Sequence, residues 1–285
     1  MVQNKLVNVK GHDLYIEYNN SFENKPTIVF LHDSLGCVQL WRDLPSKLSE
    51  ATECNVLVYD RLGYGKSDPM PTSIRPTNYM ELESDALNDL LNVLNIHNAI
   101  LLGHSDGGTI ALITASKYPE KVKAVICEAG HIFVEDVTLK GIYEAWEAYK
   151  TTNLSDRLKK YHGDKVEMLF KAWTETWTRD DYRQWNVEYL LKGVRCPLLF
   201  IQGEADEYGT LDQLEKTLSQ VSGKTEKYII PDAGHTPHKE VPDLFFKRAK
   251  EFIDTIKVNF HFNISSGLFF VLFLKIFSFK NSFQL

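Results

Sequence analysis

The residues that could do chemistry centre on one serine. The sequence from Gly103 to Gly107 reads G-H-S-D-G, a G-x-S-x-G pattern. An apolar run, 99–102, precedes it and a helix-like stretch, 109–118, follows it. In a strand–turn–helix setting this pattern exposes the serine at the tip of the strand, and the flanking glycines leave room for a strained turn. The pattern therefore predicts a nucleophile at Ser105, against the alternative of a serine in an ordinary glycine-rich turn.

A serine hydroxyl is a weak nucleophile at neutral pH and needs a neighbouring base. His235 lies just after the expected strand 227–230, at the same carboxyl edge of the sheet as Ser105. We predict His235 as the base, against the alternative of a surface-loop histidine. His238, its near neighbour, is interpreted as a loop residue.

The base also needs an acceptor that holds it in one tautomer. Asp206 follows the expected strand 197–201 directly and is the predicted acid. Glu128, at the end of another expected strand, is kept as a rival. Glu204 and Glu207 are expected to be solvated.

Short apolar runs alternate with helical periods along most of the chain. A hairpin is expected over 6–9 and 14–18, followed by buried strands at 27–31, 55–59, 99–102, 122–127, 197–201 and 227–230. The main expected helices are 38–49, 79–94, 109–118 and 245–256. This alternation predicts an α/β fold with a mostly parallel eight-stranded sheet and helices on both faces. Ligand chemistry in such sheets lies at the carboxyl ends of the strands.

One stretch, residues 131–195, has no buried-strand pattern and is too long for a simple loop. We interpret it as a helical cap inserted into the domain 1–257. Its aromatic residues are expected either to line a substrate pocket or to pack against the sheet. These aromatic residues are Tyr143, Trp146, Trp173 and Trp177.

The order Ser105, Asp206, His235 is the serine–acid–histidine order of the α/β-hydrolases. Residues 60–68 also match that family's D-x-x-G-x-G-x-S loop, which is largely structural. Over residues 5 to 257 the chain thus resembles the α/β-hydrolase fold superfamily. The stretch 103–113 is similar to the valacyclovirase-like (biphenyl-hydrolase-like) members. The resemblance implies a serine hydrolase without a cofactor or a metal.

Acyl transfer needs two donors for an oxyanion, and the resemblance places them as backbone N–H groups. One is the N–H of Asp106; the other is that of Ser34, with Leu35 as the alternative. The loop resembles H-G-x-x-G, but Asp33 replaces the usual glycine and is expected to affect the turn. His32 is expected to hold this loop. In some members an aspartate at position 106 binds a substrate amine; the alternative is a hydrogen bond within its own turn.

The composition of the chain indicates which kinds of molecule it binds. The chain has 285 residues, a net charge of −6 and no basic stripe, which argues against nucleic acid. Four scattered cysteines and the absence of a signal-like N-terminus favour a cytoplasmic protein without disulfides. No motif indicates a metal or a cofactor, a small-molecule substrate is expected, and the sequence leaves the oligomeric state open.

The phenylalanine-rich segment 258–285 stands apart from the domain. Its apolar run is shorter than the about 20 residues that span a bilayer, and Lys275 interrupts it. Three interpretations remain: contact with a membrane surface, cover for an apolar patch, or a non-native extension.

Three functions are compatible with the motifs. The first is hydrolysis of an ester, thioester or amide through an acyl-enzyme. The second uses the same residues for C–C bond hydrolysis or a lyase step. The third is a non-catalytic binding protein of the same fold. Dehalogenases and epoxide hydrolases are disfavoured, because those relatives carry aspartate at the position of Ser105.

Overall fold

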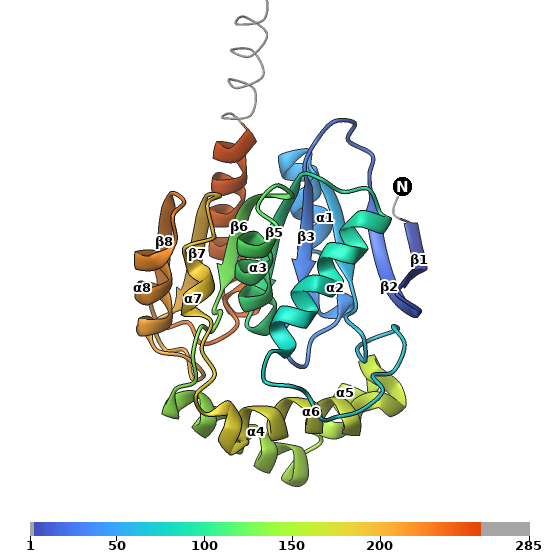
Figure 1. Cartoon of the computed structure of the whole chain (residues 1–285), viewed down its shortest axis with the longest axis vertical. Coiled ribbons are helices and arrows are strands. Elements are labelled where there is room, and N and C mark those ends of the chain that lie inside the picture. The colour runs from blue at the N-terminus through green and yellow to red at the C-terminus, as the bar shows by residue number, and fades with distance from the viewer. Residues whose placement is uncertain (1–2, 258–285) are drawn as a thin grey trace, which may run out of the picture.

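The computed structural model describes residues 3–257, and its strands form one twisted sheet (Figure 1). Within these residues the strand order is β1-β2-β4-β3-β5-β6-β7-β8. The pairs β1–β2 and β2–β4 are antiparallel, and every later neighbouring pair is parallel. The mostly parallel eight-stranded sheet is therefore confirmed. The strands are β1 (Gln3–Val9), β2 (His12–Asn19), β3 (Thr27–Leu31), β4 (Asn55–Tyr59), β5 (Ala99–His104), β6 (Val122–Glu128), β7 (Leu198–Gly203) and β8 (Thr225–Ile230).

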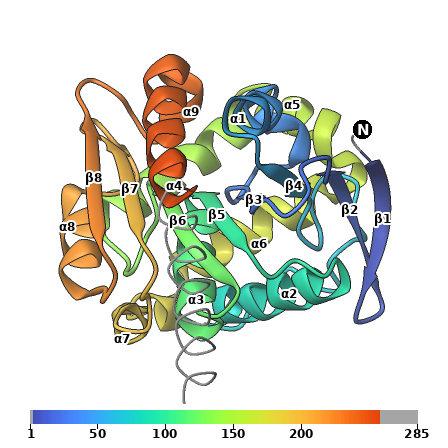
Figure 2. The same ribbon diagram turned by 90° about the horizontal axis from the view of Figure 1, so that it is seen from above.

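Helices cover both faces of the sheet, as Figure 2 shows from above. Helix α1 (Leu44–Thr52) and a last helix, residues 242–257, lie on one face. Helices α2 (Tyr79–Val93), α3 (Asp106–Lys117) and α8 (Leu211–Gln220) lie on the other.

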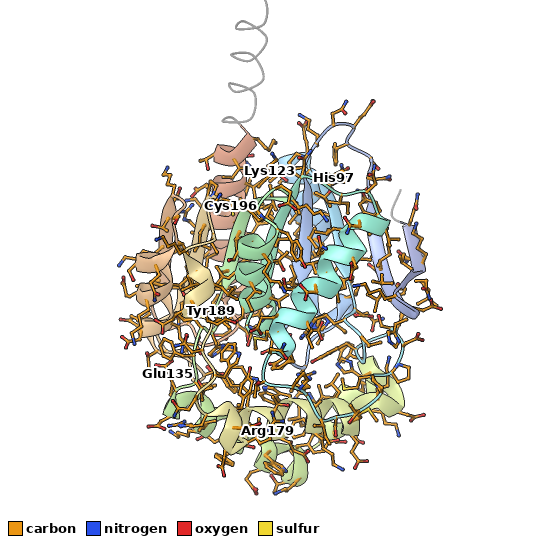
Figure 3. The ribbon with its side chains drawn as sticks, in the orientation of Figure 1. His97, Lys123, Glu135, Arg179, Tyr189 and Cys196 are labelled. Atoms are coloured by element: carbon orange, nitrogen blue, oxygen red, sulfur yellow. The ribbon has the colours of Figure 1, made fainter. Side chains whose placement is uncertain are left out.

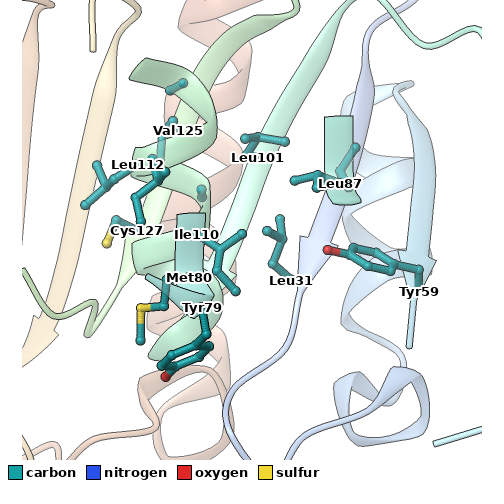
Figure 4. Packing of buried hydrophobic residues seen from close by; sticks show 14 of the residues in the cluster. Leu31, Tyr59, Tyr79, Met80, Leu87, Leu101, Ile110, Leu112, Val125 and Cys127 are labelled. Carbon is teal, nitrogen blue, oxygen red and sulfur yellow. The ribbon is translucent and has the colours of Figure 1, made fainter. Parts of the chain in front are cut away.

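The alternating direction of strand side chains gives each helical layer its own core. In β5, Ile100 and Leu102 pack with α1 and the last helix, whereas Leu101 packs with α2 and α3. Figure 4 shows Leu101 among Leu31, Leu87 and Ile110. All of these side chains are fully buried, which for a leucine contributes roughly 1.5–3 kcal/mol of stability. The central strands are thus held from both faces, and their carboxyl ends form a rigid platform.

The segment expected as one helix over 38–49 is divided in two, so that prediction is wrong in detail. A 3₁₀ turn, η1 (Val38–Trp41), ends at Arg42, which has a positive φ of 53°. Helix α1 then begins at Leu44, with Pro45 in its first turn. Proline suits that position because the first N–H groups of a helix have no intrahelical acceptor.

Between β6 and β7 the chain is helical. Its helices are α4 (Asp136–Thr151), α5 (Leu154–His162), α6 (Val166–Thr178) and the short α7 (Glu188–Leu191). Helices α4 to α6 lie across the carboxyl ends of the strands, at the bottom of Figure 1, whereas α7 packs beside the sheet on α3 and α8. The layer of α4 to α6 is called the cap below.

Polar contacts tie the cap region to the main domain. Glu135, directly before α4, and Arg179, directly after α6, are labelled in Figure 3, and Cys196 lies far from both, toward the other end of the strands. The Glu135 carboxylate accepts from the Thr210 hydroxyl at 2.6 Å. The Arg179 guanidinium donates to the carbonyl oxygen of Arg75 at 3.0 Å. The cap therefore has a defined position over the strand ends.

Within residues 3–257 no helix has the length and apolar character needed to cross a bilayer. The segment 258–285 lies outside the described residues, so its three interpretations stay predictions.

Candidate active site

Ser105 occupies a strained turn between β5 and α3. Its φ of 55° and ψ of −121° lie in a region that residues with a Cβ rarely adopt. A Cβ on Gly103 would come within 2.1 Å of the Gly107 carbonyl oxygen, and a Cβ on Gly107 within 2.0 Å of the Leu31 carbonyl oxygen. Both glycines are needed, because the turn brings the start of α3 against β5 and the end of β3.

His235 and Asp206 approach Ser105 from the loops after β8 and β7. The His235 Nε2 lies 3.0 Å from the Ser105 Oγ, and its Nδ1 lies 2.8 Å from the Asp206 Oδ1. An ionised carboxylate only accepts, so Nδ1 carries the proton and Nε2 is free to accept from the serine. The structure thus brings the three sequence-predicted residues into one hydrogen-bonded line.

The Asp206 carboxylate is held ionised by its surroundings. Its side chain is only 1% exposed, and burial alone would raise its pKa. The neighbouring His235 and the backbone N–H of Tyr208 more than offset that effect, and the pKa lies below the ordinary value. The N–H of Gly209 donates to the same Oδ1 at 3.2 Å. Asp206 is therefore a fixed anion facing the imidazole.

The rival acid, Glu128, is engaged elsewhere. Its Oε2 lies 2.7 Å from the Nδ1 of His238, and its Oε1 accepts from the His238 backbone N–H at 2.7 Å. His238, expected in a loop, is buried at the start of the short helix α9 (Pro237–Glu240). Of the two glutamates expected to be solvated, both are exposed, yet Glu207 accepts from the His235 backbone N–H at 3.0 Å.

The loop after β3 is held rigid around Asp33. The carbonyl oxygen of Asp33 accepts from His32 Nδ1 at 2.8 Å and from the Arg61 guanidinium at 2.9 Å. The backbone N–H of Arg61 donates to His32 Nε2 at 3.1 Å, so His32 holds the loop, as expected. The Asp33 carboxylate fills the space over Gly36, where a Cβ would lie 2.0 Å from its Oδ1. This turn accommodates the aspartate in place of the usual glycine.

One expected oxyanion donor lies in the turn and the other in this loop, and the two segments approach each other at Gly107 and Leu31. The N–H of Asp106 is the first of helix α3 and has no acceptor within the helix. Ser34 is buried in the loop directly after β3, the strand whose last carbonyl contacts Gly107. Helix α3 also directs the positive end of its dipole toward this place, which favours a developing negative charge.

The Asp106 carboxylate is buried, and its hydrogen bond is to a residue outside its own turn. It is 1% exposed, accepts from the Tyr79 hydroxyl at 3.1 Å and lies 3.9 Å from the Arg61 guanidinium. The Tyr79 hydroxyl in turn accepts from the Trp177 Nε1 at 3.1 Å. Neither Tyr79 nor Arg61 was singled out from the sequence. A chain of polar contacts thus joins the serine turn to cap helix α6.

Aromatic rings from the cap region and the loops surround His235. The ring of Tyr208 lies 4.8 Å from it and that of His131 lies 5.7 Å from it, between centroids. Trp177 lies 5.5 Å from His131, and Trp173 lies 6.3 Å from Tyr208. Sequence reasoning missed His131 and Tyr208. The position of Tyr208, two residues after Asp206, was the signal available for it.

One group among the described residues has the composition of a metal site. Ligand atoms of His104, Glu128 and His238 all lie within 4.8 Å of one another, and all three residues are buried. Two of these residues bind each other, since Glu128 accepts from His238, and His104 donates its Nε2–H to the carbonyl oxygen of His235 at 2.8 Å. We therefore interpret the group as a hydrogen-bonded network.

With this fold and site described, the class of protein is clear. A profile of the α/β hydrolase fold family matches residues 26–173, just over half of the chain. The chain belongs to this family and is a hydrolase of that fold. The resemblance predicted from the motifs is confirmed.

Three relatives illustrate the match. The human serine hydrolase BPHL is 28% identical over 259 residues, covering 86% of this chain and 85% of the relative. A 2-hydroxy-6-oxononadienedioate/2-hydroxy-6-oxononatrienedioate hydrolase from Klebsiella pneumoniae is 26% identical over 271 residues, covering 85% and 92%. Among solved structures, the enol-lactonase from Burkholderia xenovorans LB400 has a TM-score of 0.69 at 19% identity, covering 87% of this chain and 99% of that one.

Proposed function

We propose that this chain is a serine hydrolase that cleaves an ester or related acyl bond of a small molecule through an acyl-enzyme on Ser105. The hydrogen-bonded line from Asp206 through His235 to Ser105 carries the proposal. It is the arrangement that a serine hydroxyl needs to become a nucleophile at neutral pH.

The proposed reaction has two halves. The Ser105 Oγ attacks the carbonyl carbon while its proton passes to His235 Nε2, and the N–H groups of Asp106 and Ser34 hold the oxyanion. His235 then gives that proton to the leaving group as its bond to the acyl carbon breaks. In the second half His235 takes a proton from water, the hydroxide oxygen bonds to the acyl carbon, and Ser105 leaves with the proton returned. Asp206 stabilises the imidazolium in both halves.

A second candidate is C–C bond hydrolysis with the same three residues. The Klebsiella relative supports it, because its name describes a hydrolase of a 2-hydroxy-6-oxo dienedioate. A lyase step is supported in the same way by the putative 2-succinyl-6-hydroxy-2,4-cyclohexadiene-1-carboxylate synthase of Bacillus subtilis, which is 26% identical to this chain. A non-catalytic binding protein is disfavoured, since such a role would not require the three side chains in line.

A fluorophosphonate probe tests the proposal directly. We expect the folded full-length protein to be labelled at Ser105, because the probe reacts with a serine activated by a base. Peptide mass spectrometry would locate the label. Folded protein that remains unlabelled would favour the binding protein. A parallel panel of p-nitrophenyl esters and a ring-cleavage diketone would separate acyl from C–C specificity.

We propose that Asp106 supports the turn rather than selecting amines, because its carboxylate is buried against Tyr79 and near Arg61. The test compares p-nitrophenyl esters of leucine and of 4-methylpentanoate, which differ only in the α-amino group. We expect Asp106→Asn to lower kcat/KM for both esters by factors that agree within about threefold, or less than 1 kcal/mol. A loss confined to the leucyl ester would instead assign amine binding to Asp106.

We also propose a small-molecule substrate as the partner and a cytoplasmic location. The cysteines support that location. Each one is a free thiol, and Cys37, Cys54 and Cys127 are buried in the core, where cysteine acts as a small apolar side chain.

A further inference from the structure

The loop that carries His235 is held by carboxylates along its backbone. The N–H groups of Gly234 and Thr236 donate to Glu240, at 2.6 and 2.9 Å. The N–H of His235 donates to Glu207 at 3.0 Å, and that of His238 donates to Glu128 at 2.7 Å. Residue 237 is a proline and has no N–H. Every backbone N–H from residue 234 to residue 238 therefore donates to a carboxylate. This segment lies in no strand or long helix, so these hydrogen bonds define its conformation.

The carbonyl side of the same loop is held by His104. Its Nε2–H donates to the His235 carbonyl oxygen at 2.8 Å, and its side chain is 2% exposed. His104 is the last residue of β5, directly before Ser105. Strand β5, which precedes the nucleophile Ser105, thus also binds the backbone carbonyl of the base His235. The same strand therefore positions both reacting groups.

His104 and Glu128 are neighbours in the sheet, since they pair directly in the register of β5 and β6. Two carboxylates face the imidazole of His104: the buried Glu128 on β6, and the partly exposed Asp33 in the loop after β3, whose Oδ1 lies 3.9 Å from Nδ1. Burial would lower the pKa of His104, but these two anions raise it. The carbonyl oxygen of His235 only accepts, so the Nε2 of His104 carries a proton and donates it.

Burial separates the four holding residues into two pairs. Glu207 and Glu240 are exposed, so water replaces their hydrogen bonds when they are removed. Glu128 is fully buried and His104 nearly so, and nothing replaces their bonds. The buried pair therefore controls the position of the loop.

We propose that His104 and Glu128 are positioning residues that clamp the backbone of residues 235–238, keeping the His235 imidazole within reach of both Ser105 and Asp206. This inference rests on the proposed serine hydrolase function and deepens it. Neither residue contacts the reacting atoms; His104 acts through the carbonyl of His235, and Glu128 acts through the backbone N–H of His238. A shift of about 1 Å in a reacting group costs about 100-fold in rate, which sets the scale of the effect.

The test pairs His104→Phe with His104→Gln. Phenylalanine has a similar size but no donor, whereas the glutamine amide places an N–H close to the position of Nε2. We expect His104→Phe to lower kcat about 100-fold with KM nearly unchanged, and His104→Gln to recover most of that loss. Rates are measured per active site titrated with fluorophosphonate, at a temperature where each variant is folded.

The Glu128→Gln variant covers the case in which His104→Phe does not fold. Glutamine keeps the volume of Glu128 and one acceptor for the His238 N–H, but it loses the charge. We expect a fall in kcat of about tenfold with KM nearly unchanged, because His235 is held less firmly against Asp206. The exposed Glu204→Gln is the matched control and leaves both quantities unchanged.

The outcomes separate this inference from the proposed function. If the wild-type chain is neither labelled nor active, both are overturned. If the wild type is active but His104→Phe and His104→Gln have the same kcat per titrated site, only the clamp is overturned. The same holds if Glu128→Gln lowers the titrated fraction alone, with kcat per titrated site and KM unchanged, since that is the signature of a purely structural role.

Discussion

Replacement of Ser105 by alanine is expected to lower kcat by about 10⁵- to 10⁶-fold, the scale on which a nucleophilic serine contributes. The substitution removes only the hydroxyl, and with it the hydrogen bond of 3.0 Å to His235. Alanine keeps the Cβ that Ser105 already places at a φ of 55°, so the turn gains no new strain. Initial rates on the best p-nitrophenyl ester of the wild type, with thermal unfolding measured in parallel, check this result.

The control for this variant is Ser46→Ala, an exposed serine on helix α1. It is expected to retain wild-type turnover and stability. A Ser105→Ala protein that is folded and still turns over at more than about 1% of the wild-type rate would mean that another group attacks the substrate, because loss of a catalytic nucleophile leaves far less. The assignment of Ser105 would then be wrong.

Replacement of Asp206 by asparagine is expected to lower kcat by about 10⁴-fold. The asparagine amide would present N–H groups to His235 Nδ1, and the imidazole would turn to the tautomer whose Nε2–H faces Ser105. That tautomer cannot accept the serine proton. The measurement is kcat and kcat/KM on the same ester, with Glu204→Gln as the control. If the activity of the variant stays within tenfold of the wild type, Asp206 is not the residue that orients His235.

The same variant is also expected to change how the free energy of unfolding depends on pH. The pKa of Asp206 is lowered in the folded protein, so its contribution to the free energy of unfolding is present above the ordinary pKa and is lost as the pH falls through the lowered one. Asp206→Asn should lack that loss on the acid side. Urea unfolding of both proteins between neutral and acid pH would measure the difference.

Much of the scaffold could be predicted from residue patterns because it depends on local physics. Runs such as 27–31 and 99–102 are continuously apolar since parallel strands are buried on both faces, and the structure has strands there. The turn at Ser105 could be predicted because the G-x-S-x-G pattern lies between a strand run and a helix run, and Gly103 makes room for Gly107, four residues on. The contact of Gly107 with the Leu31 carbonyl is distant in the chain and became visible only in the fold. The break at Arg42 could not, because a positive φ at an arginine has no signature in the sequence.

Residue patterns alone could not decide between Asp206 and Glu128 as the acid. Both follow buried strands, and both reach the same edge of the sheet. The loop after β7 brings Asp206 to 2.8 Å from His235, while Glu128 is buried against His238. Which carboxylate meets which imidazole depends on the paths of the loops after β7 and β8 and on their packing, and neither path is encoded in local periodicity.

The linear chain therefore specified the strands, most of the helices that pack on the sheet and the chemical types gathered at one edge, since hydrophobic periodicity acts over a few residues. Which polar side chains contact one another was decided only by the tertiary structure. Asp106 faces Tyr79 and Arg61, and His104 holds the peptide of His235, because side chains distant in the chain were buried together. A buried polar group must find a partner within reach, and only the packed arrangement of all the elements determines which group that is.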